Sequence, residues 1–378
     1  MARTVSWDIL RDLAGFRAQK GCAISLYLDL DPSVTPTAGD AASRINALLA
    51  EGDRGFAKDT LTHDQKAALK KDFARIEEFF ARDFDRDGSR GFALFVAGLD
   101  GAWSPLALTE PVADHVRIAR RFHLAPLVPL VGRGDGALVA VVSRERGNLY
   151  RLRSGRLVEL DDLSEEQPRR HDQGGWSQAR YQRSIDNQAI QHVQTVAEEL
   201  QRQLKHHQGA RAVVVSTEEM RPEFESALDQ ESLAAVVGWT NAEAHANANE
   251  LLASVVPVLE RSRRRLEDEV VERWLEESGK AARAAAGWEQ TLEAASDARV
   301  QVLLYANGVR RKAWQCPQCS RVAATPGSCP LDGTRMEEHD DAVDLAVCRV
   351  LEGGGTVWAL EHRTDLDDVE GVGALLRF

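Results

Sequence analysis

Apolar residues recur along the chain at two spacings, one typical of helices and one typical of strands. Intervals of three and four residues predict helices at 7–20, 41–51, 62–84, 287–295 and 341–351. Short alternating or continuous apolar runs predict strands at 22–30, 91–99, 105–112, 300–305 and 356–360. Because strands and helices follow one another along the chain, the pattern predicts an α/β fold with helices on the faces of open sheets.

The middle of the chain combines a predicted meander with further strands and helices. Strands are predicted at 137–143, 148–153 and 156–160, with a turn at Arg146–Gly147. The β-branched run at 212–216 is typical of a parallel strand that is covered on both faces. A helix at 222–228 and a strand at 233–237 follow, and then a long helix or helix pair at 241–277 that we expect to be kinked or broken at Pro257.

One apolar stripe marks a helix of about seven turns in the centre of the chain. It consists of Tyr181, Ile185, Ala189, Val193, Val196, Leu200 and Leu204. The preceding loop contains Gly174 and Gly175, which reach left-handed conformations at little cost, and Ser177, a favourable N-cap. The pattern therefore predicts a glycine-hinged loop that leads into a rigid helix. An ordinary surface loop with an N-cap has the same signals, so this segment alone assigns no function.

Paired cysteine motifs near the C-terminus predict a metal site. Cys316-Pro-Gln-Cys319 and Cys329-Pro-Leu-Asp332-Gly have the form of two zinc knuckles, which places a small zinc ribbon at about 313–336. Cys316, Cys319, Cys329 and Asp332 are the expected ligands of a structural zinc ion, and His339 is the rival for the fourth position. Four protein ligands leave no open position for a substrate, so we assign this site no catalysis.

Length and charge limit the remaining classes of function. A chain of 378 residues predicts two or three domains. The net charge of −12 argues against general coating of nucleic acid, so any RNA contact must use local basic clusters and be sensitive to salt. No apolar run is long enough to cross a membrane, and the N-terminus has no apolar signal core, so we expect a cytoplasmic protein.

Two segments resemble one protein family. The loop is similar to the Gly-Gly-Gln loop of archaeal and eukaryotic class-one peptide-chain release factors. It is closer to the Gly-x-x-Gln variant of the related peptidyl-tRNA hydrolases, here Gly175-Trp176-Ser177-Gln178. The tail, residues 369–378, resembles the Gly-x-Gly-Gly-Ile-Leu-Arg-Tyr ending of release factors and Pelota rescue factors. Trp176 stands where the three-residue motif has glutamine, and residues 42–46 replace the stop-codon motif Asn-Ile-Lys-Ser.

The resemblance implies a three-domain architecture. We expect an N-terminal α/β domain at 1–160 and a central α/β domain at 161–262 with the glycine loop and the long helix. The C-terminal α/β domain at 263–378 would resemble kink-turn-binding ribosomal proteins, with the zinc ribbon as an insertion. Stop-codon decoding is not expected.

The implied function is hydrolysis of peptidyl-tRNA on stalled or split ribosomes. Gly174 and Gly175 would shape the loop, Gln178 would enter the peptidyl-transferase centre, and Trp176, Arg180 and Arg183 would contact rRNA. Expected partners are the ribosome, peptidyl-tRNA and a translational GTPase, with the protein as a monomer. The alternative is a non-catalytic hibernation or rescue factor that occupies the ribosomal A site.

Overall fold

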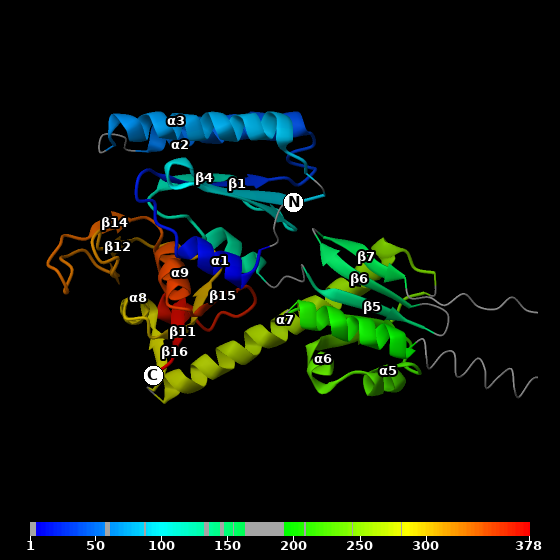
Figure 1. Cartoon of the computed structure of the whole chain (residues 1–378). Helices are drawn as coiled ribbons and strands as arrows, with labels where there is room; N and C mark the ends of the chain where they lie inside the picture. Colours follow the sequence, from blue (N-terminus) through cyan, green and yellow to red (C-terminus); the bar gives the residue numbers. More distant parts are fainter. Residues whose placement is uncertain are drawn as a thin grey trace, which may run out of the picture. The chain divides into compact units, whose positions relative to one another are not determined.

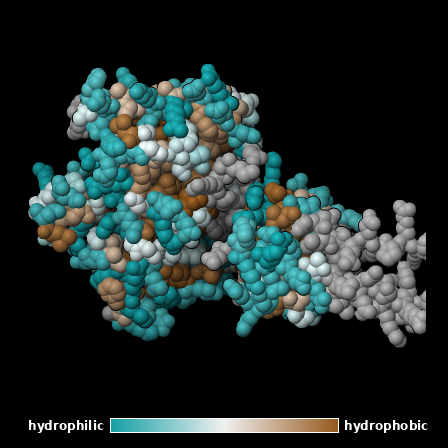
Figure 2. All heavy atoms as spheres, in the orientation of Figure 1, coloured by the Kyte–Doolittle hydropathy of each residue, from teal (hydrophilic) through white to brown (hydrophobic). Residues whose placement is uncertain are grey.

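The structure is a computed structural model that describes most of the chain. The described residues are 5–56, 61–86, 88–131, 136–143, 147–153, 155–162, 193–207, 209–243, 245–280 and 282–378. They divide into two compact units, Met1–Gly132 together with Arg264–Phe378, and Arg133–Arg263. The first unit therefore joins the two ends of the sequence. None of the described helices is long and apolar enough to cross a membrane, and the face in Figure 2 is largely hydrophilic with separate hydrophobic patches.

An antiparallel sheet forms the N-terminal part of the first unit, with the strand order β3-β2-β1-β4. Its strands are β1 (Ala23–Asp29), β2 (Gly91–Ala97), β3 (Ala102–Leu108) and β4 (His115–Ala119), with a short helical turn η3 (Gly98–Asp100) after β2. Helices α2 (Ala38–Gly55) and α3 (His63–Glu78), with the π-helical turn η2 (Phe79–Asp83), lie side by side over one face (Figure 1). Thr37 and Thr62 start these helices with capping boxes.

The central strands of this sheet are buried on both faces. Ile24, Leu26 and Leu28 point toward α2 and α3, while Ala23 and Tyr27 point to the opposite face. Because successive side chains of a strand alternate between faces, an almost continuous apolar run is needed in such a strand. This explains the pattern that predicted β1 and β2.

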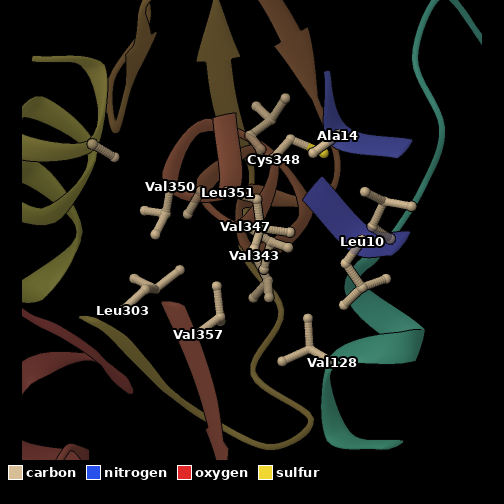
Figure 3. Close-up of a cluster of buried hydrophobic side chains, with 14 of the residues drawn as sticks. Leu10, Ala14, Val128, Leu303, Val343, Val347, Cys348, Val350, Leu351 and Val357 are labelled. Atoms are coloured by element: carbon tan, nitrogen blue, oxygen red, sulfur yellow. The ribbon is translucent and has the colours of Figure 1, made fainter. Parts of the chain in front are cut away.

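A mixed sheet forms the C-terminal part of the same unit, with the order β10-β16-β11-β15. The elements are β10 (Ala284–Ala286), α8 (Gly287–Ser296), β11 (Val300–Ala306), α9 (Ala342–Glu352), β15 (Thr356–Leu360), η5 (Asp367–Val369) and β16 (Val372–Leu376). Its core continues into α1 (Trp7–Ala14) and η4 (Ala125–Leu130). Figure 3 shows Leu10 of α1 and Val128 of η4 around Val343 and Val347 of α9. One hydrophobic core therefore holds the two ends of the chain together.

A buried carboxylate lies in this shared core. Asp344, near the start of α9, is 6% exposed and accepts hydrogen bonds from the backbone amides of Leu124 at 2.7 Å and Ala125 at 3.1 Å. The Nδ1 atom of His123 lies 3.2 Å away, and Nη1 of Arg117 lies 3.6 Å away. Burial alone would raise the pKa of Asp344. His123, Arg117 and the amide of Leu124 lower the pKa by more than burial raises it, so the net shift is downward.

The tail motif has a direct steric cause. Gly371 has φ +76°, a left-handed conformation that favours glycine. A Cβ atom on Gly373 would lie 2.7 Å from Nε1 of Trp274 and 2.8 Å from its Cε2. Trp274 is held by a 3.1 Å hydrogen bond from its indole to the carbonyl oxygen of Ala285. Both glycines are therefore required by the packing of β16, which occupies the centre of the sheet.

The second unit contains a five-stranded sheet between two helical layers. Its order is β7 (Arg156–Asp162), β6 (Gly147–Arg153), β5 (Leu138–Val142), β8 (Ala212–Ser216) and β9 (Val236–Thr240). The helix at 193–206, α5 (Arg221–Ala227) and α6 (Gln230–Ala235) pack on one face. The first part of α7 (Ala248–Gly279) packs on the other face. The boundary between the two units falls within α7.

Three of the differences between the structure and the sequence prediction concern the middle of the chain. The predicted N-terminal domain extended to residue 160, but β5 pairs in parallel with β8, so the meander belongs to the unit Arg133–Arg263. Residues 230–235 are helical, and the strand predicted at 233–237 begins only at Val236. α7 continues through Pro257, because Leu251, Val255 and Val258 are buried on either side of this exposed proline. Tertiary packing there outweighs the helix-breaking preference of proline.

We expect Gly373→Ala to lower the free energy of unfolding by about 1–3 kcal/mol, because the new methyl group overlaps the fixed indole of Trp274. Denaturant titration followed by tryptophan fluorescence measures this change. Gly279→Ala is the matched control, since a Cβ atom there meets nothing within 4 Å. An equal midpoint for both variants would show that the steric explanation of the tail motif is wrong.

Candidate functional site

The predicted zinc ribbon forms a small three-stranded sheet. Its strands are β13 (Val322–Ala323), β12 (Ala313–Gln315) and β14 (Glu337–His339), with β12 in the middle. The local core consists of Cys316, Cys329 and Met336, with Trp314 and Ala323 packed against it. So few apolar side chains stabilise a fold weakly, and small domains of this kind usually need a metal or a disulfide.

The two knuckles have the same backbone geometry. In the first, the amide of Ser320 donates to the carbonyl of Cys316 at 2.9 Å, and the amide of Cys316 donates to Arg321 at 2.8 Å. In the second, Gly333 donates to Cys329, and Cys329 donates to Thr334, both at 2.8 Å. Ser320 and Gly333 occupy equivalent positions, with φ +62° and +72°. Asp332 therefore stands where the first knuckle has Cys319.

The four predicted ligands come together in space. Sγ of Cys319 lies 3.5 Å from Sγ of Cys329, and Sγ of Cys316 lies 3.3 Å from Oδ2 of Asp332. All four ligand atoms lie within 4.8 Å of one another. Zinc bonds of about 2.3 Å to sulfur and 2.0 Å to oxygen place tetrahedral ligands about 3.5–3.8 Å apart. The residues therefore fit a tetrahedral site for zinc, which would supply folding energy to the ribbon.

Backbone amides stabilise negative charge at this site. The amide of Thr334 donates to Oδ1 of Asp332 at 2.9 Å and lowers the pKa of this carboxyl to about 2. Burial raises the pKa of the Cys329 thiol, but the amides of Leu331 and Asp332 act against it, and the net shift is downward. His339 is not among the clustered ligands of the described residues. The geometry thus favours Asp332 as the fourth ligand, which the sequence left open.

Two arginines that sequence analysis did not single out contact the first knuckle. Nη2 of Arg17 donates to the carbonyl of Pro317 at 2.8 Å, and its Nη1 donates to Oγ of Ser320 at 3.3 Å. Nη2 of Arg121 donates to the same hydroxyl at 3.3 Å. Ser320 itself is 5% exposed. We call Arg17, Arg121, Pro317 and Ser320 the arginine clasp. No local sequence signal identifies it, because its arginines lie about 200 or more residues from the knuckle.

The residues predicted to act on RNA lie outside the described part of the chain. Gly174, Gly175, Trp176, Gln178, Arg180 and Arg183 all fall within residues 163–192. The described segments on either side nevertheless show where this stretch leaves the central unit. The last described residue before it is Asp162, at the end of β7, and the helix resumes at residue 193.

Both ends of this stretch lie at one edge of the central sheet. β7 and β6 are antiparallel, as are β6 and β5, so β7 runs in the same direction as β5, β8 and β9. β7 therefore ends at the carboxyl edge of these strands. The helix at 193–206 packs on the sheet and leads to the start of β8, so its residue 193 lies toward the same edge. In sheets with parallel strands, this is the edge where ligands usually bind.

β6 contacts the segments on both sides of this stretch. The side-chain amide of Asn148 donates to Oε1 of Glu159 on β7 at 2.6 Å. Arg151 donates from Nη1 to Nε2 of His207, at the end of the helix, over 2.8 Å. Burial and the nearby Arg151 lower the pKa of His207, which keeps its imidazole neutral and able to accept. These contacts join β7 and the end of the helix to β6.

Arg44, in the region that replaces the stop-codon motif, has a structural role. Its Nη2 lies 2.5 Å from Oδ2 of Asp114, and Oδ1 of Asp114 accepts from the amide of Asp29. Arg44 therefore pairs with the loop before β4.

For the metal centre, we expect the purified chain to bind about one zinc ion. Asp332→Asn should weaken its binding roughly tenfold or more, because it removes a charged ligand. His339→Asn is the matched control and should retain wild-type affinity. Competition with a chromophoric chelator measures both. Equal affinities for the two variants, or a loss confined to His339→Asn, would contradict the assignment of Asp332.

The folded central unit should lose stability at acidic pH. The pKa of His207 is below its ordinary value of 6.5, so the contribution of its neutral form is complete above pH 6.5 and is lost as the pH falls through the lower folded value. His207→Gln retains an acceptor without titrating, so it should reduce the slope of stability against pH below 6.5. Denaturant midpoints from pH 5 to 8 measure the slope. The same slope in both proteins would contradict the role of His207.

Comparison with known proteins supports the resemblance at the centre of the chain. Residues 123–261 match the model of bacterial archaeo-eukaryotic release factor family 10. None of the curated proteins matches the chain.

Among solved structures, an archaeal Pelota from a model of ribosome-bound Pelota and ABCE1 is 16% identical, with 76% of this chain and 77% of that chain covered and a TM-score of 0.44. Dom34 of S. cerevisiae is described as a translation termination-like factor that interacts with Hbs1. It is 12% identical, with 76% of this chain and 79% of that chain covered and a TM-score of 0.41. The archaeal termination factor aRF1 is 15% identical over 99% of each chain, with a TM-score of 0.27.

Most of the family match lies in the unit Arg133–Arg263, where the glycine loop is predicted. The central part of the chain, residues 123–261, is thus similar to bacterial archaeo-eukaryotic release factor family 10.

Proposed function

We propose that the protein acts on the ribosome in translation termination or rescue, and that it hydrolyses peptidyl-tRNA on stalled or split ribosomes. The observation that carries this proposal is the family match at residues 123–261, which spans Gly175-Trp176-Ser177-Gln178. The tail motif, whose Gly371 and Gly373 are required by packing, agrees with it.

The proposed hydrolysis requires few catalytic groups from the protein itself. The ester between peptide and tRNA is already activated, and the ribosome supplies much of the site. The loop has to position a water molecule and offer a hydrogen-bond donor near the oxyanion that develops in the transition state. The amide of Gln178 is suited to this role, and Gly174 and Gly175 allow the backbone to adopt left-handed conformations. The proposed zinc ion takes no part, because its four protein ligands leave no open position.

The described structure agrees with delivery of the loop from a rigid base. Residues 162 and 193 lie at one edge of the sheet, and the helix after the loop buries Val193, Val196 and Leu200 in the core. Asn148 and Arg151 of β6 tie the two flanking segments to the sheet. A base held in this way limits the conformational entropy that is lost when the loop binds.

Charge sets the expected mode of ribosome binding. Because the whole chain carries −12, contact with rRNA has to come from local clusters such as Arg180 and Arg183, and it should weaken with salt. Delivery by a translational GTPase, a monomeric state and a cytoplasmic location remain parts of this proposal.

Trp176 favours a second candidate function. It occupies the position of the glutamine in the three-residue motif, and a large indole is better suited to stacking on a base than to positioning water. A non-catalytic factor that occupies the A site of idle or stalled ribosomes would use the same loop for binding alone.

Gln178→Ala should lower the rate of peptide release by about 10²–10³-fold, the usual effect of removing one oxyanion donor. Ribosome binding should remain unchanged, because Trp176, Arg180 and Arg183 are retained. The measurement follows labelled peptide from ribosome–peptidyl-tRNA complexes, with cosedimentation as the binding assay. Gln173→Ala, which lies in the same loop outside the motif, is the matched control.

Equal release by Gln178→Ala and Gln173→Ala would remove Gln178 from the mechanism. Binding to idle ribosomes without release by the wild type would support the non-catalytic factor instead. A failure to cosediment at moderate salt would exclude both functions.

A further inference from the structure

We propose that Cys319 is an oxidant-sensitive ligand, and that its modification by a hydroperoxide such as hydrogen peroxide releases the metal and opens the arginine clasp. The inference goes beyond the proposed function. It depends on the metal centre and on contacts between Met1–Gly132 and Arg264–Phe378, which belong to one compact unit.

Access separates Cys319 from the other cysteines. Cys316 is 0% exposed and Cys329 is 2% exposed, whereas Cys319 is exposed. Cys348 is buried in the shared core and Cys22 is half-buried. An oxidant from solvent therefore meets the metal centre first at Cys319.

A second sulfur is within reach of Cys319. Sγ of Cys329 lies 3.5 Å away and belongs to the other knuckle. A disulfide bond has a length of about 2.05 Å, so a small approach of the two knuckles joins these atoms. Such a bond removes two of the four ligands at once, and the remaining pair, Cys316 and Asp332, holds a metal ion far more weakly.

The reaction balances with one peroxide molecule. The sulfur of Cys319 attacks one peroxide oxygen, the O–O bond breaks and hydroxide leaves. The thiolate of Cys329 then attacks the sulfur of Cys319, an S–S bond forms and a second hydroxide leaves. Two protons from solvent convert both hydroxides to water. The two thiolates lose two electrons, the peroxide gains them, and the metal leaves as a divalent ion.

The arginine clasp transmits this change away from the ribbon. Ser320 follows Cys319 directly, and its φ of +62° depends on the knuckle turn that the amide of Ser320 closes on Cys316. Its buried hydroxyl accepts from both Arg17 and Arg121. The segments that carry these arginines are themselves joined, because the amide of Ala18 donates to the carbonyl of Arg120 at 2.8 Å. Loss of the turn therefore removes an acceptor from each of two segments near α1 and β4, and Arg121 is then left with its ion pair to Glu352.

The test treats the zinc-loaded full chain with one to two equivalents of hydrogen peroxide. Released zinc is followed with a chromophoric chelator, disulfides are mapped by mass spectrometry, and amide exchange is measured for residues 11–22 and 117–125. We expect release of the bound zinc, a Cys319–Cys329 disulfide and roughly tenfold faster exchange in both segments. Cys22→Ser, the matched cysteine control, should respond like the wild type.

Ser320→Ala isolates the clasp from the metal, since it keeps all four ligands. It should retain zinc and show faster exchange in the two segments before any peroxide is added. Retention of zinc at stoichiometric peroxide, a disulfide between other cysteines, or a chain that binds no zinc would each overturn the proposal. So would unchanged exchange in residues 11–22 and 117–125 after zinc is lost.

Discussion

The packing of α9 against α1 and η4 places a charged carboxylate inside the larger unit, and the two ends of the chain meet around it. Asp344 is almost fully buried, and removing a carboxylate from water costs several kcal/mol unless it is paired and hydrogen-bonded. The amides of Leu124 and Ala125 meet this requirement only when the segment after β4 lies against α9. His123 in that segment also contacts Tyr27 of β1, through the tyrosine hydroxyl and the carbonyl of His123. When the segment after β4 packs against α9, the carboxylate of Asp344 is hydrogen-bonded. When this packing is wrong, the carboxylate is buried without these partners.

The shared core has a consequence for how the molecule is divided. The resemblance implies three domains, while the described residues form two compact units in which residues 5–131 and 264–378 fold together. Leu10 of α1 and Val128 of η4 pack with Val343 and Val347 of α9 (Figure 3). The N-terminal and C-terminal segments of this unit therefore share one core. A core of this size is bound mainly by apolar burial. Asp344 and the arginine clasp then determine the position of the segments around it.

The ribbon and the central unit are stabilised in two different ways. In the ribbon, the local apolar core is small, and a metal ion held by Cys316, Cys319, Cys329 and Asp332 would stabilise the turns. In the central unit, the sheet is covered on both faces, and the flanks of residues 163–192 are fixed by buried valines and by the side chains of Asn148 and Arg151. The ribbon would thus depend on a bound ion, whereas the central unit depends on packing and, through His207, on pH.

The sequence alone determined the features that depend on local pattern. Periodicity predicted most strands and helices and the α/β class, and knuckle spacing predicted that Cys316, Cys319, Cys329 and Asp332 cluster, because neighbours along the chain set these properties. Only the tertiary structure decided that the meander at 138–162 joins the central sheet, that α7 continues through Pro257, and that Arg17 and Arg121 reach the first knuckle. Each of these results depends on contacts between residues far apart in sequence, where packing and long-range hydrogen bonds outweigh local preference.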